Sequence, residues 1–220
     1  RDKPYFLFVP GAVLTMWRGL DRSFTRALER EGVPVQDTAG IYTKVLFRRK
    51  RDNADGGDWL DAYTRQEDGF KAGDLLAFSG DNYLLVQRDH RENGVYNRFN
   101  AVRCNQTITL GKWVKSTEPN DFGEYLNIFT PYATTPAYMV TQLTGLNKTV
   151  IGSVLGGTVA VIMPAYPIDV NVPVKCHYID PTMEFVEREF TVESMDCTDV
   201  NTDAEGNIGG ILRLQIKLSP

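Results

Sequence analysis

The chain of 220 residues is 42% hydrophobic and 24% charged, and its formal net charge at pH 7 is −4. These values are typical of a globular protein with one large or two ordinary domains, and they exclude the disordered and collagen-like classes. A weakly acidic chain also gives no indication of a polyanion as its partner. The three cysteines are far apart and include no Cys-x-x-Cys pair, which argues against a disulfide scaffold and favours a reducing compartment.

Two segments resemble membrane signals, and both are interrupted by residues that break helices. Residues 1–17 start with basic side chains and an apolar run, but Pro10 ends that run too early for a signal peptide. Residues 149–168 carry no charge, but Gly157, Pro164 and a β-branched run favour buried strands over a transmembrane helix. We therefore expect no membrane as a partner.

Residues 15–31 have the clearest helical pattern of the chain. Apolar side chains that include Trp17, Phe24 and Leu28 recur at helical spacing, and arginines occupy the opposite side. Gly32 predicts the end of this helix. The apolar stripe has to be covered either by the chain's own barrel or by a neighbouring subunit.

Beyond the helix, short apolar runs separated by Gly, Asp, Asn and Ser predict strands and tight turns. The first set fits a small SH3-like or Greek-key β-barrel over residues 33–118, preceded by an N-terminal arm and helix over residues 1–32. A polar stretch at residues 115–121 is the predicted linker. The predicted strands of the barrel are residues 41–48, 60–66, 75–78, 83–88 and 95–104.

Residues 122–220 predict a second β-rich domain, either a sandwich or another barrel. Its cleanest strand is the last, where Leu212, Leu214 and Ile216 alternate with polar side chains. The fold class is therefore mainly β. The predicted strands of this domain are residues 125–129, 137–142, 158–163, 172–178, 185–192 and 211–218.

Two clusters contain residue types that bind metal ions, and each has a simpler explanation. The Asp-x-Asn-x-Asp-x-Glu pattern at residues 199–205 resembles a calcium loop, but Gly210 stands where the bidentate glutamate belongs, so a polar hairpin tip is favoured. Cys176, His177 and Cys197 offer zinc ligands, but adjacent residues on a strand point to opposite faces. We favour a buried cysteine and a surface histidine, and we expect no metal or other cofactor.

The remaining polar motifs give little indication of chemistry. The basic run at residues 48–51 could contact a nucleic-acid backbone, but the acidic residues that follow would largely neutralise it, so a solvated hairpin tip is favoured. Asn105 and Asn147 begin glycosylation sequons, which matter only in a secreted protein. There is no Gly-x-Ser-x-Gly motif and no distinctive carboxylate pair, so we expect no catalytic residues and no enzyme.

Several short motifs resemble one known family. They are Phe-x-x-Gly-Asp at residues 70–74, Gly-Asp-Asn-Tyr-Leu-Leu-Val at residues 80–86, and Arg-Cys-Asn-Gln-Thr at residues 103–107. They look like the barrel of tailed-bacteriophage head-tail connector proteins of the head-closure or stopper type. The Gly-Gly-Ile-Leu-Arg-Leu sequence at residues 209–214 is similar to the C-terminal sequence of larger members.

The resemblance implies a virion structural protein, assembled in the host cytoplasm, that has no catalytic residues. Copies would form a homo-oligomeric ring around the DNA channel, bound to the portal or adaptor above and to tail proteins below, with non-specific contact to DNA. A loop at residues 52–58 or 89–94 would reach the channel. Another tail or baseplate position and a free-standing β-barrel that binds a ligand are the alternative functions. We expect subunit contacts from five side chains: Tyr5, Phe6, Phe8, Trp17 and Phe24. The alternative is an intramolecular core, which would explain the N-terminal segment equally well.

Overall fold

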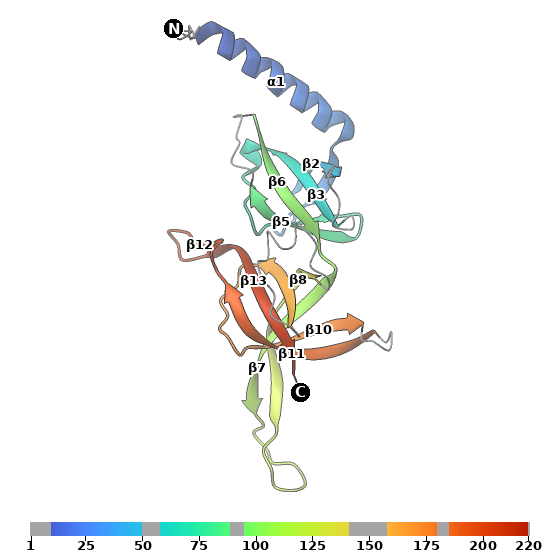
Figure 1. Cartoon of the computed structure of the whole chain (residues 1–220), viewed down its shortest axis with the longest axis vertical. Helices are drawn as coiled ribbons and strands as arrows, with labels where there is room; N and C mark the ends of the chain where they lie inside the picture. Colours follow the sequence, from blue (N-terminus) through green and yellow to red (C-terminus); the bar gives the residue numbers. More distant parts are fainter. Residues whose placement is uncertain (1–9, 50–57, 89–94, 141–157, 180–184, 220) are drawn as a thin grey trace, which may run out of the picture.

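The computed structural model describes residues 10–49, 58–88, 95–140, 158–179 and 185–219. These residues form one α-helix, a closed β-barrel and a second β-sheet, which follow one another along the long axis of an elongated molecule (Figure 1). This arrangement confirms the predicted mainly β class, with a helix first, a barrel next and a second β-rich unit after it.

The barrel consists of antiparallel strands in the order β1-β2-β3-β6-β5-β4, and it is closed because β1 pairs with β2 on one side and β4 on the other. Alternate side chains fill its interior, where Val45, Leu76 and Phe99 are completely buried. The strands are β1 (Val33–Gln36), β2 (Tyr42–Arg49), β3 (Trp59–Arg65), β4 (Leu75–Phe78), β5 (Asp81–Arg88) and β6 (Tyr96–Arg103), and a 3₁₀ helix (Gln66–Asp68) follows β3.

Helix α1 (Pro10–Glu31) lies at one end of the barrel, and its first turns extend beyond it (Figure 1). The helix begins earlier than predicted because proline fits the first helical turn, where an N–H has no partner within the helix. It ends as predicted: the N–H of Gly32 donates to the carbonyl oxygen of Leu28 (2.9 Å). A Cβ at Gly32 would lie 2.2 Å from the same oxygen, so only glycine fits there.

The C-terminal half of α1 is packed on the outside of the barrel. Phe24 and Leu28 are buried against Leu46 of β2, and the ring centroids of Phe24 and Tyr96 are 4.9 Å apart. Full burial of apolar side chains of this size stabilises a fold by about 1.5–3 kcal/mol each. Strand β2 is consequently buried on both faces, since Leu46 contacts the helix while its neighbour Val45 points into the barrel.

The second sheet has the order β11-β10-β7-β8-β9-β13-β12, and β11 also pairs with β13. This additional pairing returns the sheet onto itself around an apolar core that includes Ile108, Val174 and Phe190. The strands are β7 (Gln106–Lys115), β8 (Asn127–Val140), β9 (Thr158–Pro164), β10 (Pro173–Ile179), β11 (Phe185–Asp196), β12 (Val200–Thr202) and β13 (Ile208–Leu218).

The barrel gives way to the second sheet at Cys104 and Asn105, earlier than the expected end of the barrel domain at residue 118. Strand β7 belongs to the second sheet because it pairs with β8 along its whole length and with β10 over residues 108–110. The expected linker at residues 115–121 therefore lies at the end of the β7–β8 hairpin. Local composition cannot separate a linker from a hairpin tip, since both are polar and contain proline.

The two units share an apolar core. Trp59 of β3 is completely buried, and its ring meets that of Tyr138 of β8 edge-on, with centroids 5.7 Å apart. Burial of aromatic side chains between the units fixes them against one another. The members of this shared core are Trp59, Leu84, Val86 and Val102 from the barrel, and Tyr138, Val140, Ala160, Ile162 and Ile211 from the second sheet.

Candidate functional site

The motifs that carry the family resemblance meet at the junction of the barrel and the second sheet. Gly73 has a φ of 97°, and a Cβ there would lie 2.0 Å from the carbonyl oxygen of Gly210. Gly210 has a φ of 95°, and its own Cβ would lie 2.0 Å from the carbonyl oxygen of Asp199. Both positions require glycine, because any side chain would force these backbones apart.

Arg103 holds the end of β6 at this junction. Its guanidinium donates to Asp58 Oδ1 from Nε (3.2 Å) and Nη2 (2.9 Å), and it lies 3.7 Å from Asp81 Oδ2. The hydrogen bonds to Asp58 are the main cause that raises the pKa of Arg103. Because the Arg103 side chain is 49% exposed, these ion pairs contribute at most about 1 kcal/mol each, and their main effect is to orient the strand end.

Asn105 continues the pairing of the second sheet with its side chain. Its Nδ2 donates to the carbonyl oxygen of Met139 (2.9 Å), and its Oδ1 accepts from the Met139 N–H (2.8 Å). The Asn105 amide therefore replaces the main-chain groups of a strand where the chain passes from β6 to β7. The N–H of the preceding Cys104 donates to the carbonyl oxygen of Asn82 (2.8 Å), which ties the same connection to β5.

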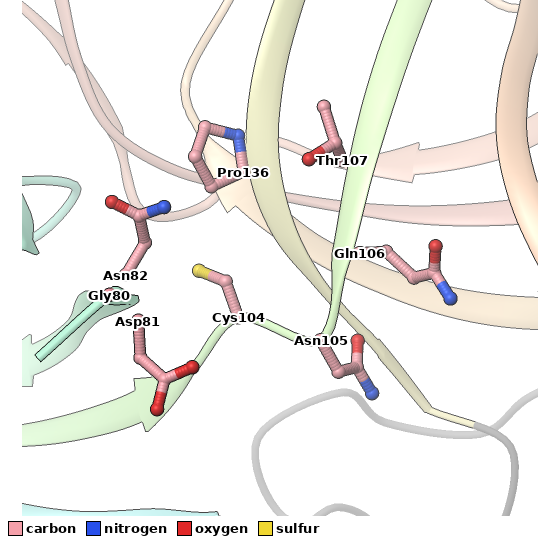
Figure 2. Close-up of a pocket in the computed structure, with 8 residues that line it drawn as sticks. All are labelled: Gly80, Asp81, Asn82, Cys104, Asn105, Gln106, Thr107 and Pro136. Atoms are coloured by element: carbon pink, nitrogen blue, oxygen red, sulfur yellow. The ribbon is translucent and has the colours of Figure 1, made fainter.

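A polar pocket of about 280 Å³ opens beside this connection (Figure 2). The thiol of Cys104 points toward the side of the pocket on which Asn82 and Pro136 lie. Burial raises the pKa of this thiol to about 12, so it is protonated at neutral pH and is a weak nucleophile. The amide and hydroxyl groups suit hydrogen bonding to a small polar ligand. The lining residues are Gly80, Asp81, Asn82, Cys104, Asn105, Gln106, Thr107 and Pro136.

The β7–β8 hairpin continues past the second sheet as a two-stranded arm, residues 111–133 (Figure 1). Strand β10 pairs with β7 only over residues 108–110, and β9 pairs with β8 only over residues 138–140. Seven of the fourteen large apolar side chains that the structure shows as exposed belong to this arm, so its surface is unusually apolar. They are Trp113, Val114, Phe122, Tyr125, Leu126, Ile128 and Tyr132.

Aromatic contacts fix the base of the arm. The Phe129 ring covers Gly111 so closely that a Cβ at Gly111 would lie 2.3 Å from it. The ring of Trp113 meets Phe129 edge-on at 5.9 Å, and the Lys175 ammonium of β10 lies 4.7 Å from the centroid of Phe129. Such cation–π and edge-on contacts hold the arm in one orientation relative to the second sheet.

Hydrogen bonds order the tip of the arm, residues 116–126. Asn120 Oδ1 accepts from the N–H groups of Phe122 (3.0 Å) and Glu124 (2.9 Å). Ser116 Oγ accepts from the Leu126 N–H (3.1 Å). This turn presents Phe122 to solvent with 89% of its surface exposed, which is an unfavourable position for a phenyl ring on an isolated chain.

The residues predicted as subunit contacts have different outcomes. Phe24 is packed within the chain, so its burial is accounted for without a neighbour. Tyr5, Phe6 and Phe8 lie outside the described residues, as does the side chain of Trp17, and their role in subunit contacts stays a prediction. The loops predicted to reach a channel also lie outside the described residues, apart from Asp58.

The acidic residues of the calcium-like pattern are engaged in local contacts. Asp203 Oδ1 accepts from the N–H groups of Glu205 (3.0 Å) and Asn207 (2.8 Å), and the Asn207 side chain is the main cause that lowers the pKa of Asp203. Asp199 is paired with Arg213. Across the described parts of the chain, no group of three or more His, Cys, Asp and Glu residues is placed to hold a metal ion.

The zinc-like residues and the basic run are also dispersed. Cys176 is buried in the core of the second sheet, whereas Cys197 is exposed. Arg48 is paired with Glu31 of α1, and Arg49 is exposed. Lys50 and Arg51, like the side chain of His177, lie outside the described residues. Neither pattern is brought together into a site by the residues that the structure describes.

The arm was missed by sequence reasoning, which divided its residues between a linker and a short strand. A signal was present: Trp113, Val114, Phe122 and Tyr125 are large apolar residues on both sides of a polar turn.

Within the described residues, no helix combines the length and apolar character needed to cross a membrane. Comparisons with family models, curated proteins and solved structures find no match to this chain.

Proposed function

We propose that this chain is a structural protein of a tailed-bacteriophage virion. In this proposal, copies form a ring at the head-tail junction, as a head-closure, stopper or neck protein, that seals the DNA channel and joins the portal or adaptor to the tail. The observation that carries the proposal is the apolar arm, because exposed aromatic side chains on an ordered hairpin need a protein surface to cover them.

The junction supports the same reading. A protein that transmits contacts between a head and a tail needs its two ends held in a fixed relation. The shared core around Trp59 and Tyr138, the backbone contact of Gly73 with Gly210 and the Asn105 hydrogen bonds all restrain the barrel against the second sheet. The motifs that resemble connector proteins supply many of these junction residues, which gives the resemblance a structural role.

The partners follow from this role. Copies of the chain would contact one another in the ring, with the portal or adaptor on one side and tail proteins on the other. Contact with DNA in the channel would be non-specific, since a chain with a net charge of −4 has little bulk attraction for a polyanion.

Immunogold electron microscopy tests this function. Particles from the culture that produces the protein are labelled with a gold-conjugated antibody against the chain, and an antibody against a known tail protein serves as the control for access. Gold at the head-tail junction is the expected result. Gold further along the tail would move the protein to a tail or baseplate position, and particles without gold despite labelled controls would overturn the virion role.

A free-standing ligand-binding module is the second candidate, and the polar pocket beside Asn82 and Cys104 favours it. Such a module would bind its ligand as a single copy and be absent from particles. Ligand-induced chemical-shift changes confined to the pocket residues, in a chain that no particle contains, would favour this candidate over the virion role.

A further inference from the structure

The tip of the arm has a specific surface chemistry. It combines exposed apolar side chains, Phe122 and Tyr125 foremost, with three acidic residues, Glu118, Asp121 and Glu124. No lysine or arginine lies within residues 116–126. Aromatic rings together with carboxylates form the natural complement of arginine, because a guanidinium group stacks on aromatic faces and binds carboxylates through paired hydrogen bonds.

The opposite end of the molecule presents arginines. Arg22, Arg26 and Arg30 are spaced by four residues on α1, so they share one side of the helix, away from the side on which Phe24 and Leu28 are buried. All three arginines are exposed. Arg30 is paired with Glu31, whereas Arg22 and Arg26 form no ion pair with any residue whose side chain the structure describes. We call this surface the arginine face.

The tip and the arginine face of one chain cannot meet, because they lie at opposite ends of the elongated molecule (Figure 1). We infer that the tip binds the arginine face of a second copy of this chain, so that copies join head to tail. In this contact Phe122 and Tyr125 stack on the guanidinium groups of the neighbour's α1, while the acidic side chains of the tip pair with them. When two copies join through two different surfaces, each copy keeps its other end free for the next copy. This is the geometry that builds rings or chains.

Two features favour binding at this place. The hydrogen bonds of Asn120 and Ser116 hold the tip in one conformation before it binds, which lowers the entropy cost of association. Covering Phe122 removes the most exposed large apolar side chain of the described residues from water. The inference rests on the proposed function only in that copies of the chain contact one another. It is testable in solution without any particle.

Charge reversal in the full chain tests the contact. One variant carries Glu118→Lys, Asp121→Lys and Glu124→Lys, and a second carries Arg22→Glu and Arg26→Glu. A control carries Arg49→Glu and Lys71→Glu, which reverse exposed charges of the barrel. Molar mass is measured by sedimentation velocity as a function of protein concentration, and circular dichroism checks that each variant is folded.

The wild type is expected to gain mass with concentration, and to lose this association as salt is raised, because the contact is charged. Each reversal alone is expected to weaken association by about a hundredfold, whereas the control leaves it unchanged. An equimolar mixture of the two reversed variants is expected to recover association, because each then meets a surface of opposite charge.

Two outcomes would overturn the inference. One is a wild type that remains a single copy up to about 100 μM, because a contact of such low affinity would be too weak for specific assembly. The other is a mixture that does not recover. If the wild type is a single copy and the tip reversal still removes the protein from particles, the tip binds a different protein. Gold at the head-tail junction, together with a chain that stays a single copy in solution, would support the proposed function and overturn this contact. Self-association in solution without gold on the particles would support this contact and overturn the proposed function.

Discussion

The Asn105 side chain makes a sharp test of how the two units are joined. Asn105→Ala removes both hydrogen bonds to Met139 and leaves the N–H and C=O of that residue without these partners. Met139 is only 2% exposed, so water does not readily replace the lost partners. A buried main-chain group left without a partner costs about 1–3 kcal/mol, so we expect the free energy of unfolding to fall by about 2–4 kcal/mol.

Urea unfolding followed by tryptophan fluorescence measures this loss, because Trp59 lies in the shared core. With an m value of about 3 kcal/mol per molar, the midpoint is expected to fall by about 1 M urea. The matched control is Asn100→Ala, since Asn100 is not fully buried and, among the described residues, its side chain makes one hydrogen bond, a 3.5 Å contact with Gln87. We expect this control to stay within about 0.5 kcal/mol of the wild type. An Asn105→Ala loss no larger than that of the control would refute the role of Asn105 as a continuation of the sheet.

Three other measurements probe the junction and the core. Gly73→Ala should lower the free energy of unfolding by at least about 2 kcal/mol more than Gly69→Ala in thermal unfolding, because both have positive φ but only Gly73 meets backbone. Burial raises the pKa of Asp74, so between the unfolded and folded pKa values the unfolded chain has released this proton while the folded chain still holds it. The free energy of unfolding therefore falls as pH rises through that range. Comparison of Asp74→Asn with wild type from about pH 3 to 6 should show the variant gaining relative stability, and a constant difference would contradict this. In mass-spectrometric alkylation of the native chain, exposed Cys197 should react well before Cys104, whose burial raises its pKa to about 12, and equal rates would contradict the described burial.

Local sequence patterns were sufficient to predict the end of α1 and the last strand, because neighbouring residues determine both. The end of α1 was predicted because Gly32 is the residue that its terminal geometry requires. The last strand was predicted because alternate apolar side chains point to the core, although β13 begins at Ile208 rather than residue 211. The start of α1 was placed too late, since Pro10 was treated as a break when it opens the helix.

The features that the sequence did not predict, the length of β8 and the arm, depend on long-range strand pairing. Strand β8 is one 14-residue strand, whereas two shorter strands were expected on either side of Pro131 and Pro136. Proline is compatible with a strand where its missing N–H faces away from a partner. The arm itself depends on β7 and β8 pairing beyond their other neighbours, and no local pattern carries that information. Its exposed aromatic residues were therefore not recognised as a surface.

The return of β11 onto β13 also bears on how the chain avoids joining other molecules through its backbone. In both units of the described chain, most strands have partners on two sides, so few rows of main-chain hydrogen-bonding groups are open to another molecule. The arm is the longest exception, and Lys112, Lys115 and Pro131 disfavour the addition of a foreign strand along it. Backbone-to-backbone joining is thus disfavoured in the described parts of the chain. Contact through side chains is then the main route to association that the described strands leave open.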